Sequence, residues 1–73
     1  MTNEKRERFS RIFPARVDTL RDTLRKIANT SNKASYEWDK EKVQDAWILI
    51  GEEFTSTARN FGIKFNIEVT DIT

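Results

Sequence analysis

The chain has 73 residues, of which 37% are hydrophobic and 34% are charged, and its formal net charge is +1. It contains no cysteine and no histidine, which excludes disulfides, thiolate chemistry, the commonest transition-metal ligand and the usual general base. We therefore expect one small domain, residues 1–73, without enzymatic activity, cofactor or metal. A domain of this size is marginal alone, and oligomerisation is the stabilising device that remains.

The charge is distributed unevenly along the chain. Residues 1–38 carry nine basic and five acidic side chains, a net of +4, whereas residues 39–73 carry four and seven, a net of −3. Two antiparallel helices with these charges would attract each other, and so would two copies related by a two-fold axis. A chance imbalance on solvated faces is the alternative.

Residues 1–12 are polar and dense in charge, and they predict a charged N-terminal arm that is either a short helix or frayed. Pro14 either breaks a helix that runs through it or opens a new one, so we expect the first helix to begin at Phe13 or Pro14. Basic side chains neutralise phosphates, and the neighbouring Phe9 and Phe13 are able to stack on bases. The candidate nucleic-acid contacts are Lys5, Arg6, Arg8, Arg11 and Arg16.

An apolar stripe with steps of 4, 3, 4 and 3 residues predicts the first helix, which runs to about Asn29. A small polar segment, residues 29–35, then predicts a loop long enough for a second helix to fold back. Asp39 is a good N-cap, and a second stripe predicts a helix from Lys40 to about Asn60 that ends at Gly62. A strand at residues 46–50 is the rival interpretation. Gly51 indicates close approach of another helix or of the tail.

After Gly62 the apolar residues alternate with polar ones, which is the pattern of a half-buried strand. This tail, residues 62–73, is expected to pair with its own copy, to add to the sheet edge of a partner or to lie against the helices. The predicted fold is mostly α: an antiparallel helical hairpin, residues 13–61, with a short C-terminal β-strand or extended tail, completed by dimerisation. The predicted core residues are Phe13, Val17, Leu20, Leu24, Ile27, Trp38, Val43, Trp47, Ile50, Phe54 and Phe61.

The centre of the second helix, residues 46–50, is apolar on every side and needs more than one surface to cover it. Together with the tail, it predicts contact with a second copy or another protein. The candidate interface residues are Trp47, Ile48, Leu49, Phe54, Ile63, Phe65, Ile67 and Val69.

The segment from Leu24 through Asn29-Thr30-Ser31-Asn32, continuing through Tyr36 to Val43, resembles a pattern in small uncharacterised bacterial helical proteins. In that pattern a helix runs into Asn-x-Ser-Asn, and a tyrosine, an acidic cap and a second helix follow. The resemblance covers residues 20–54 and implies a helical hairpin, and it brings no activity.

These observations favour a non-enzymatic protein–protein interaction module that is homo-oligomeric. The sharper version is a small inhibitor or adaptor of phage, plasmid or bacterial origin that binds an unidentified protein. A nucleic-acid-binding protein that uses the basic arm is the alternative. No apolar run approaches the length of a membrane span, and the N-terminus lacks the apolar segment of a signal peptide, so we expect a cytoplasmic protein without membrane contact.

Overall fold

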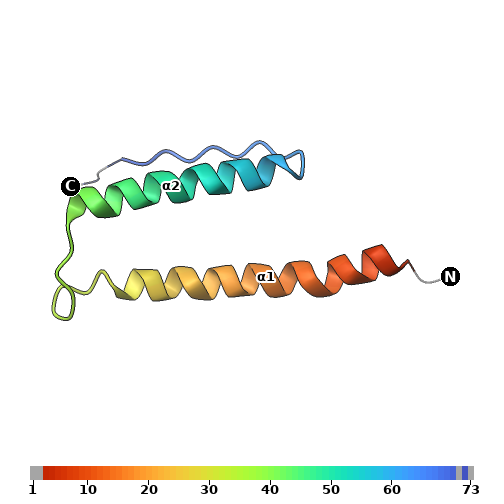
Figure 1. Cartoon of the computed structure of the whole chain (residues 1–73), viewed down its shortest axis with the longest axis horizontal. Helices are drawn as coiled ribbons and strands as arrows, with labels where there is room; N and C mark the ends of the chain where they lie inside the picture. Colours follow the sequence, from red (N-terminus) through yellow and green to blue (C-terminus); the bar gives the residue numbers. More distant parts are fainter. Residues whose placement is uncertain (1–2, 71, 73) are drawn as a thin grey trace. The chain divides into compact units, whose positions relative to one another are not determined.

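The computed structural model describes residues 3–70 and 72. Within these residues it contains two helices and no strand: α1, Glu4–Asn29, and α2, Lys40–Arg59 (Figure 1). The chain divides into two units, Met1–Tyr36 and Glu37–Thr73. The first unit holds α1 and the turns after it, and the second holds α2 and the tail. The prediction of a mostly α protein with two helices is confirmed.

Helix α1 begins at Glu4, so the predicted start at Phe13 or Pro14 is wrong, and most of the predicted arm is helical. The side chain of Asn3 caps the helix by accepting a hydrogen bond from the backbone N–H of Arg6 at 3.2 Å. Acidic residues occupy the first turn, where they interact favourably with the helix dipole. Pro14 lies inside the helix, where it removes one backbone hydrogen bond. The helix continues because strong helix formers precede the proline and the cap is satisfied.

The loop after α1 forms from the polar segment that predicts it. Thr30 and Ser31 donate their hydroxyls to the carbonyls of Ile27 and Ala28 at 2.6 and 2.7 Å, which satisfies two carbonyls at the end of the helix. Asn32 accepts the N–H of Ala34 at 3.0 Å, which makes a local turn. The predicted end of the first helix, about Asn29, is confirmed.

Helix α2 has both of its predicted ends. The carboxylate of Asp39 accepts the N–H groups of Glu41 and Lys42, at 2.8 and 3.3 Å. At the other end Gly62 has φ +72°, its N–H donates to Arg59, and the N–H of Ile63 donates to Ala58. This is the Schellman arrangement, which requires a left-handed residue and so favours glycine. The rival strand at residues 46–50 is excluded, because these residues are helical.

The tail runs back along α2 after Gly62 (Figure 1). Its early residues line a hollow with Thr55 and Arg59, and Thr70 and Ile72 line another with Lys40 at the opposite end of the helix. A 20-residue helix is about 30 Å long, so these few residues must be extended to follow it. The expectation of an extended tail is met, whereas the tail forms no strand in the described chain. A strand needs a hydrogen-bonded neighbour, and these residues supply none.

The tail contacts α2 at Gly51, the one buried residue of that helix. A Cβ at this position would lie 3.6 Å from Cγ2 of Ile67 and 3.9 Å from Cγ2 of Val69. Both contacts come from alternate tail residues, which confirms that the alternation turns one side of the tail toward the helix. Of the two uses considered for Gly51, the approach of the tail is the one observed.

Gly51→Ala is expected to stabilise the protein by about 1 kcal/mol. Alanine is the better helix former by that amount, and its methyl group would meet the tail at ordinary van der Waals distances. Urea denaturation followed by circular dichroism at 222 nm measures the change.

The matched control is the same substitution at Gly62. There the positive φ strains any L-residue, so Gly62→Ala is expected to cost about 1 kcal/mol although its Cβ would meet nothing within 4 Å. A loss of stability in Gly51→Ala would show that the tail lies closer to α2 than described.

Candidate protein-interaction surface

The first part of the surface is the apolar stripe of α1. Because the helix runs through Pro14, the stripe extends from Phe9 to Ile27, about one turn further than if it began at Phe13. The rings of Phe9 and Phe13 stack with centroids 4.8 Å apart, as expected for residues one turn apart. Leu20 is 45% exposed, and Leu24 is half-buried. The first unit therefore presents one continuous apolar face.

The second part is the apolar stripe of α2. Val43, Ile50 and Phe54 are half-buried, while Trp47 and Phe61 are exposed, at 39% and 56%. At 100° per residue, Val43, Trp47, Ile50 and Phe54 fall on one side of the helix, and Phe61 follows just after its end. They leave the Gly51 side to the tail, so α2 has one side covered within its own unit and an adjoining apolar side open.

None of the predicted core residues is buried in the described chain, which contains no buried hydrophobic side chain at all. The predicted core belongs to a hairpin that dimerisation completes, so it stays a prediction. The stripes are present at the predicted spacing, but neither unit by itself supplies enough surface to bury its stripe. Helical spacing identifies which residues share a face, and it does not say what covers that face.

An apolar hollow of about 340 Å³ lies between the first half of α2 and the end of the tail. Trp38 and Val43 both line it, as expected if the residue before the N-cap packs near the first turns of the helix. Trp47 lines it from the helix, and Ile67 and Val69 line it from the tail. The hollow joins the open stripe of α2 to the tail.

The candidate interface residues fall into separate groups. Trp47 and Phe54 belong to the stripe, whereas Ile48 lines a second hollow with Ile67 and Val69 on the far side of the tail. Leu49 is 62% exposed and lies about 200° around the helix from Trp47. The remaining two, Ile63 and Phe65, line the hollow at the C-terminal end of α2.

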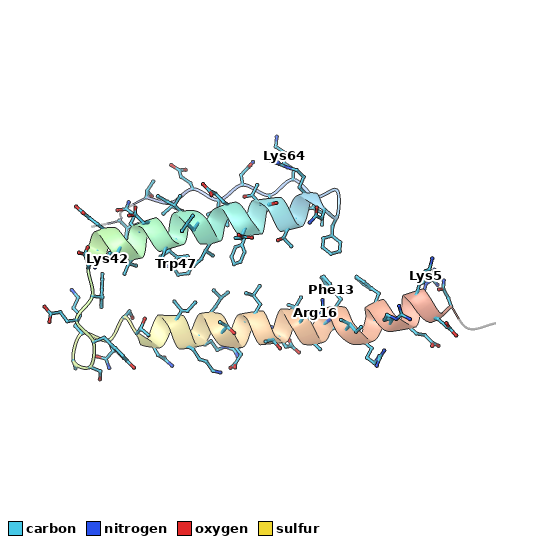
Figure 2. All side chains as sticks on the ribbon, viewed as in Figure 1. Lys5, Phe13, Arg16, Lys42, Trp47 and Lys64 are labelled. Atoms are coloured by element: carbon cyan, nitrogen blue, oxygen red, sulfur yellow. The ribbon has the colours of Figure 1, made fainter. Side chains whose placement is uncertain are left out.

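The five candidate nucleic-acid contacts are all exposed and all lie on α1. Lys5 and Arg16 lie on the same side of the helix as Phe13 (Figure 2), with Arg6 nearby on the helical wheel. Arg8 and Arg11 lie on other sides. The sequence interpretation missed this division because it treated the segment as an arm. The capping Asn3 and the i, i+4 spacing of the two phenylalanines were the signals that would have shown the helix.

The described surface also carries charged groups outside these stripes. An ion pair joins Lys26 Nζ to Asp22 Oδ2 at 3.4 Å, on the exposed side of α1, where such a pair contributes little. Among the described residues, no three Asp or Glu side chains come together in a way that could hold a metal ion. Neither α1 nor α2 has an apolar stretch long enough to cross a membrane.

Comparison with known proteins gives no match to a family model, to a curated protein or to a solved structure. The resemblance to small bacterial helical proteins therefore stays a prediction.

Proposed function

We propose that the protein is a non-enzymatic interaction module that works as a homo-oligomer, with a dimer as the basic unit. One observation carries the proposal: the described chain has two long apolar stripes and no buried hydrophobic side chain. Burial of apolar surface is the main force that favours folding, and most helical stability in proteins comes from the packing of an apolar face. A stable form of this chain therefore needs the stripes to be covered, and we propose that a second copy covers them.

The spacing of the stripes supports lengthwise packing of the helices. Steps of three and four residues favour helices that cross at about 20°, as in coiled coils and four-helix bundles. Two copies of the chain supply four such stripes. Full burial of one Val, Leu, Ile or Phe side chain contributes about 1.5–3 kcal/mol, so even a few of them offset a large part of the entropy of association.

The charge distribution supports the same arrangement. The net +4 of residues 1–38 and the net −3 of residues 39–73 attract each other when helices from the two halves lie side by side. A two-fold axis brings each half of one copy against the opposite half of the second copy, so the dimer contains this attractive contact twice.

Nucleic-acid binding through α1 is the second candidate function, favoured by the stacked Phe9 and Phe13 rings beside Lys5 and Arg16. It predicts an affinity for single-stranded nucleic acid that falls steeply with salt. The double variant Arg6→Ala, Arg16→Ala should abolish such binding. Variants Arg21→Ala and Arg25→Ala, which remove the same charge from positions across α1 from Arg16, should retain it. An affinity that does not respond to salt excludes this candidate.

Light scattering over a concentration series, with circular dichroism on the same samples, tests self-association. We expect the molar mass of a dimer or of a multiple of it at high concentration. On dilution, helicity should fall together with the mass. A fully helical monomer at every concentration would contradict the proposal. It would also indicate that the stripes cover each other within one chain or await a different protein.

A further inference from the structure

The tail, which follows α2, has backbone groups along one edge that make no hydrogen bond within the described residues. Among the described residues, the last backbone hydrogen bond of the chain is the one from Ile63 to Ala58, and none involves the backbone of residues 64–70. One side of the tail lies on α2 through Ile67 and Val69, and Figure 2 shows Lys64 on the side away from the helix. The N–H and C=O groups of an extended segment point sideways between these two sides, so they remain available to another strand.

The sequence of this segment is Ile63-Lys64-Phe65-Asn66-Ile67-Glu68-Val69. Its side chains match those of a second copy that runs in the opposite direction. When two copies are aligned antiparallel with Asn66 opposite Asn66, each Lys64 lies opposite Glu68 of the second copy. In the same alignment every apolar residue lies opposite an apolar residue: Ile63 opposite Val69, and Phe65 opposite Ile67.

We propose that the tails of two copies pair in this register as a two-stranded antiparallel ribbon whose two-fold axis passes at Asn66. The inference rests on the proposed self-association and specifies which segment of the second copy meets which. The ribbon turns its apolar side to the two α2 helices and its Lys64–Glu68 pairs to solvent. It also covers Phe65 and Ile67, which are 43% and 39% exposed in the single chain.

Other alignments lack this complementarity. Parallel pairing in register sets Lys64 against Lys64 and Glu68 against Glu68, and like charges directly opposite each other are destabilising. An antiparallel axis at Phe65 sets Lys64 opposite Asn66, and an axis at Ile67 sets it opposite Thr70, so neither makes a charge pair. A shift of one residue sets apolar against polar side chains. Within the described residues neither Lys64 nor Glu68 forms an ion pair, so both are available.

Single cysteines test the register directly, because the chain has no cysteine of its own. Directly opposite residues of an antiparallel pair have Cα atoms about 4.5–5.5 Å apart, within the range of a disulfide. Asn66→Cys should therefore form a cross-linked dimer under mild oxidation. Lys64→Cys is the matched control, since its two copies would lie about four residues, roughly 13 Å, apart along the ribbon and should not cross-link. An equimolar mixture of Lys64→Cys and Glu68→Cys should cross-link again.

Charge reversal provides a second measurement that needs no disulfide. Lys64→Glu alone creates two like-charge pairs per dimer and should weaken self-association by about tenfold. Adding Glu68→Lys restores unlike pairs and should return the dissociation constant to within about twofold of the parent. Sedimentation equilibrium gives all three constants, and circular dichroism checks that each variant remains helical.

The outcomes separate this inference from the proposed function. The paired tails would be overturned if the protein dimerises but Asn66→Cys and Lys64→Cys cross-link equally and charge reversal has no effect. Self-association would still hold in that case. A monomeric parent would overturn both. Selective cross-linking at Asn66, together with rescue by the double reversal, supports the ribbon.

Discussion

Leu24→Ala is expected to be one of the two most damaging single substitutions in this chain. Leu24 lies in the C-terminal half of the α1 stripe, between Leu20 and Ile27, and is the most covered of its regular positions even in the single chain. If association buries it fully, truncation to alanine should cost about 2–5 kcal/mol. That is a large share of the stability of any small domain. Urea denaturation at fixed protein concentration measures the loss, and light scattering should show partial dissociation.

Arg25→Ala is the matched control for Leu24→Ala. It changes the neighbouring residue on the outer side of the same helix, and alanine and arginine have similar helix propensities. We expect a change within about 0.5 kcal/mol for this exposed position. Equal stability of Leu24→Ala and the parent would mean that the α1 stripe stays exposed to water, and the proposed association through it would be wrong.

The ends of α2 could be predicted because each depends on a few neighbouring residues. Asp39 satisfies the first free N–H groups of the helix, and Gly62 adopts a backbone conformation that other residues reach only with strain. The start of α1 could not be predicted by the same means. There the helix propensity of many residues and the capping asparagine outweigh the cost of one proline. The sequence interpretation overestimated the effect of that proline.

The candidate surface was only partly predictable, for a different reason. The spacing of apolar residues correctly placed Val43, Trp47 and Phe54 on one side of α2, and the alternation in the tail placed Ile67 and Val69 together. Which surface each side meets depends on contacts between distant parts of the chain or between chains, and no local pattern encodes these. The predicted core stays a prediction for this reason, because its burial depends on such contacts. The tail illustrates the same limit, since a period of two gives an extended segment, whereas a strand also requires a hydrogen-bonded partner.

Trp47→Ala is the other substitution with a large expected effect. Trp47 belongs to the open stripe of α2 and also lines the hollow between this helix and the tail, so its indole joins the two surfaces that we propose to be covered. Removing a buried tryptophan typically costs about 3–5 kcal/mol. The loss should appear as dissociation and reduced helicity at a given concentration, and the fluorescence of the remaining Trp38 reports on the hollow.

Leu49→Ala shows which side of α2 the assembly covers. Leu49 is two residues from Trp47 but lies on nearly the opposite side of the helix, and at 62% exposure it has little apolar contact to lose in the single chain. If the stripe is the interface, this variant should stay within about 0.5 kcal/mol of the parent while Trp47→Ala dissociates. The reverse result would place the interface on the Leu49 side. Comparable losses in both variants would mean that α2 is enclosed on all sides, which requires more than one neighbouring copy and therefore an assembly larger than a dimer.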